Sequence, residues 1–136
     1  MNPDYLFVYG TLRRGSGNDL CHFLEEHAEF VGYANYQGQL YEVDYYPGAV
    51  PSDNPLDQVR GELYRLPPLE QADFVLSILD DYEEYGPAFQ APTEFVRRVQ
   101  RVQFESGESV LAWVYLYNRV TDKLKKLCSG DFIKER

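Results

Sequence analysis

Residues 79–86, LDDYEEYG, place four carboxylic acids directly after an apolar run with helical spacing. The C-terminal end of a helix is an unfavourable position for acids, because the helix macrodipole leaves partial negative charge there. A carboxyl group held in an enclosed site among other acids resists ionisation, so its pKa rises. Such a group can exchange protons near neutral pH, which makes this segment a candidate for general acid/base chemistry.

The helical wheel separates one of these acids from the other three. At about 100° per residue, a helix over residues 69–82 gathers its apolar side chains on one face. This face is formed by Leu69, Ala72, Val75, Leu76, Leu79 and Tyr82. If the helical turn continues for one more residue, Glu83 falls in the middle of the apolar face. Asp80 and Glu84 lie on its flank and Asp81 on the opposite side, so we interpret these three as solvent-facing acids.

Glu83 is therefore the candidate general acid/base. A glutamate whose pKa is raised by burial and by neighbouring acids can both accept and donate a proton near neutral pH. The wheel leaves two other structures open. In one, the helix ends at Tyr82 and Glu83 points to water. In the other, Glu83 forms an ion pair with an arginine such as Arg97 or Arg98.

Residues 8–15, VYGTLRRG, form a second candidate. A buried strand that ends in Tyr-Gly-Thr presents backbone N–H groups at a tight turn, and such donors can bind a carboxylate or a developing oxyanion. Gly10 would allow close approach of a ligand, and Tyr9 and Thr11 would add hydroxyl groups. Ordinary strand-to-loop turns have the same composition, and this segment taken alone favours that simpler interpretation.

A third candidate is the segment 112–117, AWVYLY. Successive side chains of a strand face opposite sides, so the aliphatic residues of this segment face one way and Trp113, Tyr115 and Tyr117 face the other. The aromatic side, with its hydroxyl groups, fits the wall of a pocket. It fits a solvent-facing strand as well.

Local patterns predict the elements that would position these residues. Gly and Pro clusters separate short β-branched and aromatic runs, and helical spacing occurs twice. We predict strands at 5–9, 58–66, 94–104 and 109–117, one bent strand or two strands within 29–43, a short strand within 45–50, and helices at about 19–27 and 69–82. Strands separated mostly by turns, together with two helices, indicate an α+β fold with a curled or barrel-like sheet.

Composition excludes several classes of protein. The 136 residues fit one domain, and a net charge of −9 does not suit a nucleic-acid-binding surface. Cys21 and Cys128 are far apart, and His22 and His27 lack the spacing of a zinc motif, so we expect neither a disulfide framework nor a metal site. We find no apolar stretch long enough to cross a bilayer and no secretory signal. We therefore expect a cytoplasmic protein with no nucleic-acid or membrane partner.

The chain resembles the gamma-glutamylcyclotransferase superfamily, specifically its short gamma-glutamylamine cyclotransferase and avirulence-induced-gene-like branch. The resemblance lies in an ordered set of segments: FVYGTLRRG, YPGAV, VRGELYRL, LDDYE, FVRRVQRVQ, AWVYLY and a near-terminal SGDF. It covers nearly the whole chain and implies a small mixed β-barrel of about six strands, flanked by two or more helices, with a cavity at one end. We expect a single domain over residues 1–120 and a tail, 121–136, that packs on the domain or trails from it.

The resemblance also implies a reaction on a small γ-glutamyl substrate. In this family the α-amino group of a γ-glutamyl compound attacks its own γ-carbonyl. The ring closes to 5-oxoproline and an amine or amino acid leaves, with no cofactor or metal. The family's catalytic glutamate falls on Glu83, its substrate-binding loop on Tyr9, Gly10, Thr11 and Leu12, and a tyrosine of its last barrel strand on Tyr115.

The sequence leaves the activity and the leaving group open. The same fold could serve a catalytically silent module that binds a small metabolite. In an enzyme, the leaving group could be a lysine side chain, a free amine or an acyl unit of a biosynthetic intermediate, and the resemblance disfavours glutathione. We expect Arg13, Arg14, Tyr85 and Phe89, from loops 13–18 and 84–92, to line the mouth of the cavity. The sequence does not indicate an oligomeric state.

Overall fold

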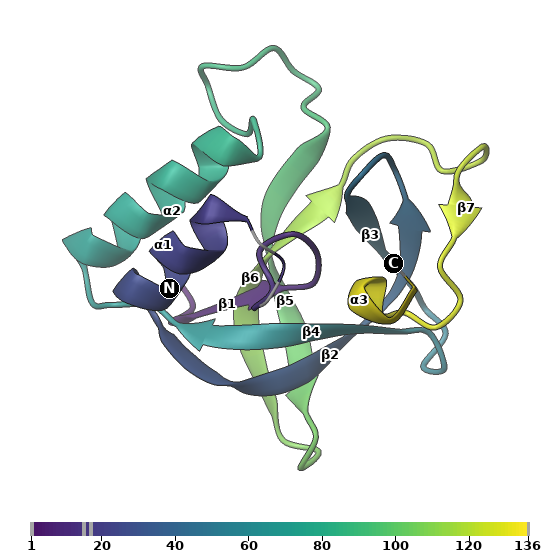
Figure 1. The fold of residues 1–136 in the computed structure, drawn as a ribbon, viewed down its shortest axis with the longest axis horizontal. Helices are drawn as coiled ribbons and strands as arrows, with labels where there is room; N and C mark the ends of the chain where they lie inside the picture. Colours follow the sequence, from purple (N-terminus) through teal and green to yellow (C-terminus); the bar gives the residue numbers. More distant parts are fainter. Residues whose placement is uncertain (1, 15, 17, 136) are drawn as a thin grey trace.

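The computed structural model describes residues 2–14, 16 and 18–135, which contain seven strands and three helices (Figure 1). In chain order the elements are β1 (Tyr5–Val8), α1 (Asp19–His27), β2 (Glu29–Glu42), β3 (Pro47–Pro51), β4 (Gln58–Arg65), α2 (Glu70–Tyr82), β5 (Phe95–Phe104), β6 (Ser109–Tyr117), β7 (Lys125–Lys126) and α3 (Phe132–Glu135). None of the helices in the described residues has both the length and the apolar character needed to span a membrane.

Five strands close into a barrel. They follow the order β2-β4-β1-β6-β5, and β5 pairs back with β2. β1 runs parallel to β6, with Leu6 opposite Trp113, whereas the other pairs are antiparallel. β3 and β7 extend the sheet from the last residues of β2. The predicted α+β fold, with a mixed barrel and flanking helices, is confirmed.

β2 is one strand that serves two parts of the sheet. Its earlier residues pair with β4 and β5, and its last residues pair with β3 and β7. Gly38 lies where β2 begins to pair with β3. A side chain there would collide with the Val50 carbonyl and the Tyr36 ring, so the close approach of the strands requires glycine. Of the two alternatives for residues 29–43, the single strand is correct.

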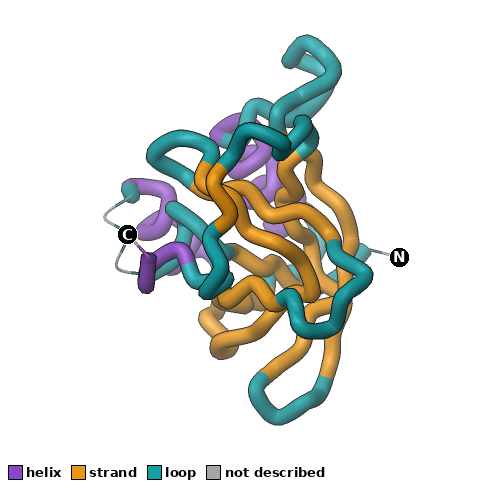
Figure 2. Tube along the Cα trace, turned by 90° about the vertical axis from the view of Figure 1, so that its right-hand side faces the viewer, coloured by secondary structure: helices purple, strands orange, loops and turns teal. Residues whose placement is uncertain are grey.

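Apolar side chains form two cores. One fills the barrel interior and includes Phe7, Leu63 and Val114. The other lies outside the barrel, where α1 and α2 cover it side by side, with the rings of Phe23 and Phe74 in edge contact at 6.0 Å (Figure 1). Figure 2 shows the strands winding around one another, with the loop after α2 and the β5–β6 hairpin at opposite ends of the molecule.

The apolar face predicted for α2 is correct for its central residues. Val75, Leu76 and Leu79 are buried in the core between α2 and the barrel. The assignment of Leu69 to this face is wrong, because its side chain is 87% exposed. The helix begins only at Glu70 and Leu69 has a φ of 54°, so the helical wheel does not apply to it.

The C-terminal residues return to the barrel. β7 pairs with the end of β2, and the buried Leu127 packs in the barrel interior while its N–H donates to the Leu40 carbonyl at 2.8 Å. Gly130 has a φ of 70° and lies directly against the backbone of Gln58. Its carbonyl accepts a hydrogen bond from the N–H of Arg60 at 2.7 Å. These contacts attach the tail to β2 and β4.

Candidate active site

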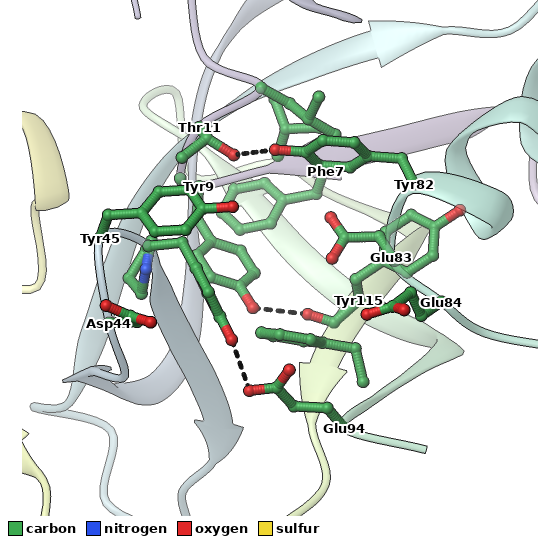
Figure 3. A pocket seen from close by; sticks show the side chains of 16 residues that line it. Phe7, Tyr9, Thr11, Asp44, Tyr45, Tyr82, Glu83, Glu84, Glu94 and Tyr115 are labelled. Carbon is green, nitrogen blue, oxygen red and sulfur yellow. Dashed lines mark hydrogen bonds between the residues drawn. The ribbon is translucent and has the colours of Figure 1, made fainter. Parts of the chain in front are cut away.

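A pocket of about 310 Å³ opens between the loop after β1, the loop 43–47 and the C-terminal end of α2 (Figure 3). All six site residues expected from the resemblance line it: Tyr9, Gly10, Thr11, Leu12, Glu83 and Tyr115. The other lining residues are Phe7, Val8, Asp44, Tyr45, Tyr46, Pro47, Tyr82, Glu84, Glu94 and Phe95. The fold thus brings together residues that are distant in the sequence, while the chemical roles expected for them stay predictions.

The end of α2 positions Glu83. The N–H of Glu83 donates to the Leu79 carbonyl at 2.9 Å, so the last helical turn continues through Glu83 although α2 ends one residue earlier. Glu84 then adopts a left-handed conformation with a φ of 55°, and the N–H of Tyr85 returns to the Asp80 carbonyl at 2.9 Å. This is the Schellman arrangement, with Glu84 where glycine is usual. The chain therefore turns sharply at Glu84, and Glu83 stays on the same side of the helix as its apolar face.

Glu83 points into the pocket (Figure 3). Among the described residues its carboxyl group has no hydrogen bond and no ion pair, so neither the pairing with Arg97 or Arg98 nor the solvent-facing alternative is present. Burial raises the pKa of Glu83 to about 8, and the negative charges of Glu94 and Asp80 add to the shift. A carboxyl group with this pKa can accept and return a proton near neutral pH.

Asp80 is not the solvent-facing acid that the wheel indicated. Arg97 on β5 donates to both carboxylate oxygens of Asp80, at 2.8 and 3.0 Å, and the Tyr115 hydroxyl donates to the same carboxylate at 2.6 Å. The Arg97 guanidinium also stacks over the Trp113 ring at 4.3 Å. The cluster joins α2 to β5 and β6, and in it Arg97 pairs with Asp80 and not with Glu83. The interpretation was wrong because a wheel gives the direction of a side chain and not the residue that lies opposite.

The loop after β1 lines the pocket and contains backbone donors without acceptors. The N–H of Arg13 donates to the Gly10 carbonyl at 3.0 Å and closes a tight turn. No described residue accepts a hydrogen bond from the N–H groups of Gly10, Thr11 or Leu12. Free N–H groups at the edge of a pocket can bind a carboxylate or stabilise an oxyanion.

Tyr9 uses its hydroxyl inside the protein. The hydroxyl donates to the Tyr115 carbonyl at 2.6 Å and accepts from the N–H of Ala49 at 3.1 Å, and burial raises its pKa. The expectation that this hydroxyl is offered to a ligand is therefore wrong, and its observed contacts join the end of β1 to β3 and β6. The Thr11 hydroxyl is hydrogen-bonded to the Tyr82 hydroxyl at 3.1 Å, which links the loop to the end of α2 (Figure 3).

Buried ion pairs attach the loop after β1 to β4 and to the C-terminal tail. The Arg13 side chain is almost fully buried and pairs with Glu62 on β4 at 3.4 Å and with Asp131 of the tail at 2.9 Å. The N–H of Arg14 also donates to Glu62 at 2.8 Å. Arg13 therefore does not line the mouth of the pocket, contrary to expectation. Its partners lie 49 and 118 residues away along the chain, so no local pattern could reveal them.

The mouth of the pocket is built from different residues than expected. Arg14, Tyr85 and Phe89 are not among the lining residues, and the loop 43–47 takes their place. Tyr46 and Glu94 were missed as site residues: the Tyr46 hydroxyl donates to the Glu94 carboxylate at 2.6 Å, and burial together with this acceptor raises the pKa of Tyr46. Tyr46 lies in the segment YYPGAV, which could have marked it as a candidate site residue. Nothing in the sequence indicates that Tyr46 contacts Glu94.

Comparisons with known proteins identify the family of this chain and agree with its fold. Residues 6–134 match the family described as gamma-glutamyl cyclotransferase, AIG2-like. The chain is 34% identical to the gamma-glutamylcyclotransferase family protein YtfP of Escherichia coli, over 94% of this chain and 95% of that protein. It is 35% identical to the gamma-L-glutamyl-butirosin B gamma-glutamyl cyclotransferase of Niallia circulans, over 84% of this chain and 67% of that protein.

A solved structure shares the fold. The crystal structure of an AIG2-like protein from Mus musculus superposes with a TM-score of 0.65 at 26% identity, over 90% of this chain and 82% of that one. The family match spans both the pocket residues and the tail that anchors the loop after β1. The chain therefore belongs to the AIG2-like gamma-glutamyl cyclotransferase family.

Proposed function

We propose that this protein converts a γ-glutamyl compound into 5-oxoproline and a free amine or amino acid. The α-amino nitrogen of the glutamyl group bonds to its own γ-carbonyl carbon, and the bond from that carbon to the leaving nitrogen breaks. The attacking nitrogen loses one proton and the leaving nitrogen gains one, so no water or co-reactant enters the balance. The reaction is intramolecular, and holding the substrate folded removes much of its entropic barrier.

Glu83 carries the proton between the two nitrogens. As a carboxylate it accepts the proton of the attacking α-amine, and as a carboxylic acid it donates to the leaving nitrogen. The observation that supports this role most directly is its inward-pointing carboxyl group, which has no partner among the described residues and whose pKa is raised to about 8. Asp80, one helical turn away, is instead fully engaged by Arg97 and Tyr115.

The loop after β1 binds the glutamyl group. Gly10, Thr11 and Leu12 line the pocket, and their N–H groups have no acceptor among the described residues. Such donors suit the substrate α-carboxylate or the oxyanion that forms at the γ-carbonyl. Tyr115 orders the site indirectly, since its hydroxyl holds Asp80 and its carbonyl holds Tyr9. The relative in Niallia circulans is named for a γ-glutamyl substrate, which agrees with a site of this kind.

The first test measures 5-oxoproline release from γ-glutamyl amines, γ-glutamyl amino acids and ε-(γ-glutamyl)-lysine. We expect wild type to release 5-oxoproline, and Glu83→Gln to lower kcat/KM by ~10²–10⁴-fold while its circular dichroism spectrum is unchanged. Asp81→Asn is the matched control, because Asp81 belongs to the same acidic segment, is exposed and does not line the pocket. It should retain wild-type turnover.

Two results would count against the proposal. Turnover by Glu83→Gln close to that of wild type would remove Glu83 from the mechanism. No release from any substrate by a folded wild-type protein would favour a binding module that holds a small metabolite without converting it.

A further inference from the structure

The two halves of the candidate active site are attached to different parts of the molecule. The loop after β1, which contains the backbone donors, is held to β4 and to the C-terminal tail by the ion pairs of Arg13. Glu83 follows α2, which Asp80 attaches to β5 and β6. The pocket lies between these two halves. The distance from the donors to Glu83 therefore depends on contacts between the loop and the end of α2.

The hydroxyl of Tyr82, the residue before Glu83, makes these contacts. It lies 3.1 Å from the Thr11 hydroxyl and accepts a hydrogen bond from the side-chain amide of Asn18 at 2.8 Å. Figure 3 shows the contact between Thr11 and Tyr82 at one side of the pocket, with Glu83 beneath it. Among the described residues, no other hydrogen bond or ion pair joins residues 9–14 to residues 70–85.

The partners of the Tyr82 hydroxyl are themselves held in place. The side-chain oxygen of Asn18 accepts from the N–H of Leu20 at 2.8 Å as the N-cap of α1, so its amide nitrogen is directed at Tyr82. The Ser16 hydroxyl donates to the Thr11 carbonyl at 2.6 Å and accepts from the N–H of Asn18 at 3.2 Å. Since Tyr82 accepts from Asn18, its own proton is available to Thr11. The network therefore holds Thr11 by both its side chain and its carbonyl.

The proposed reaction requires the loop and Glu83 to act on the same folded glutamyl group. Glu83 takes a proton from the attacking nitrogen while the N–H groups of the loop bind an oxygen of the same group. Thr11 is the central residue of the three that supply these donors, so the position of its side chain fixes the position of the donors. A displacement of about 1 Å in such an arrangement can lower the rate ~10²-fold.

From these contacts we infer that Tyr82 is a positioning residue, whose hydroxyl acts through Thr11 to keep the donor loop at its working distance from Glu83. The inference rests on the proposed cyclotransferase activity and adds a residue to its machinery. The hydroxyl is engaged by Thr11 and Asn18, so its role is to position the loop and not to exchange a proton with the substrate.

The first test is Tyr82→Phe, which removes the hydroxyl and keeps the ring. We expect kcat/KM for 5-oxoproline release to fall about tenfold while the circular dichroism spectrum is unchanged. Tyr85→Phe is the matched control, because it deletes the same group three residues further along the chain. The Tyr85 side chain does not line the pocket and its hydroxyl forms no hydrogen bond with a described residue, so this variant should keep wild-type turnover.

Variants of Thr11 test whether the Tyr82 hydroxyl acts through this residue. Thr11→Val keeps the shape of the side chain but loses its hydroxyl, and should also lower kcat/KM about tenfold. Thr11→Ser keeps the hydroxyl and should recover most of that loss. Thr11→Val combined with Tyr82→Phe should be no slower than the slower single variant, because both changes break the same contact. Two unrelated disturbances would instead multiply to about a hundredfold loss.

The outcomes separate the inference from the proposed function. Wild-type turnover by Tyr82→Phe, multiplied losses in the double variant, or equal losses in Thr11→Ser and Thr11→Val would each show that the inference is wrong, and the cyclotransferase proposal would stand. If a folded wild-type protein releases 5-oxoproline from none of the γ-glutamyl substrates, the proposed activity fails and the inference fails with it.

Discussion

Glu83 shows how its surroundings set the acid strength of a single side chain. Its carboxyl group has no cationic partner among the described residues, and Glu94 and Asp80 supply negative charge nearby. Desolvation and this repulsion both favour the neutral acid, so the pKa is raised to about 8. A residue that would be a carboxylate in water is therefore largely protonated at pH 7 in this pocket.

The rate should depend on pH with a definite sign. The proposed mechanism begins with Glu83 as a carboxylate, so kcat/KM should rise as the pH increases through about 8 and level off above it. Asp80→Asn removes one repelling charge and should move the midpoint to lower pH. The measurement is 5-oxoproline release from pH 6 to 10. A rate that falls as pH rises through 8 would contradict the role of Glu83 as the initial base.

Stability should depend on pH through the same group. The pKa of Glu83 is higher in the folded state than the ordinary value of 4.5, so the folded protein binds this proton more tightly than the unfolded chain. Its contribution to the free energy of unfolding is full below pH 4.5 and is lost as the pH rises to about 8. The free energy of unfolding of Glu83→Gln, measured relative to that of wild type, should therefore increase by roughly 4 kcal/mol between pH 5 and pH 9.

Urea unfolding of both proteins at pH 5, 7 and 9 measures this difference. A gap between wild type and Glu83→Gln that stays constant over this range would show that Glu83 has an ordinary pKa. The result does not depend on any substrate, so it tests the environment of Glu83 separately from its catalytic role.

The sequence predicted the direction of the Glu83 side chain but not the residues that bind Asp80. The apolar spacing of α2 is a local property, so it correctly placed Glu83 on the buried face. The environment of Asp80 was wrongly predicted because its partners, Arg97 and Tyr115, lie 17 and 35 residues further along the chain. The pairing of Tyr46 with Glu94 was missed for the same reason.

At the scale of an element, the loop after β1 is held in place by the buried ion pairs of Arg13. Arg13 joins this loop to β4 through Glu62 and to the tail through Asp131. Arg13→Met should lower the free energy of unfolding by about 3 kcal/mol, because it leaves the buried Glu62 carboxylate without its cation. Urea unfolding at pH 7 measures the change.

Arg14→Met is the control for this prediction. Arg14 is half exposed, its guanidinium is 3.9 Å from Glu25 and it stacks on Phe30, so its loss should cost no more than about 1 kcal/mol. Equal costs for the two variants would contradict the idea that the buried arginine anchors the loop.

The elements themselves could be predicted closely, since strands and helices follow from local alternation and spacing. Segment 109–117 alternates aliphatic and aromatic residues, and it is β6 with Val114 in the barrel interior and Tyr115 facing α2. The way in which β2 divides its pairing among four other strands was not predictable, because each partner is chosen by contacts distant in the sequence.

At the scale of the whole molecule, we propose that the tail is part of the domain. Leu127 is 4% exposed and packs in the barrel interior. Leu127→Ala should lower the free energy of unfolding by about 2–4 kcal/mol, because it leaves a cavity in a packed core. Val120→Ala is the matched control: Val120 is 82% exposed, and its truncation should cost less than about 0.5 kcal/mol. A tail that merely trailed from the barrel would give small costs for both.

The parallel pairing of β1 with β6 has a consequence for synthesis of the chain. Leu6 and its partner Trp113 are separated by 107 residues along the chain. At roughly 5–20 residues per second, a ribosome needs on the order of ten seconds to travel between them. Throughout that time β1 has an edge without its final neighbour, so the barrel cannot close until β6 has been synthesised. A transcript cut short before β6 would yield a polypeptide with an open strand edge, which is a template for aggregation.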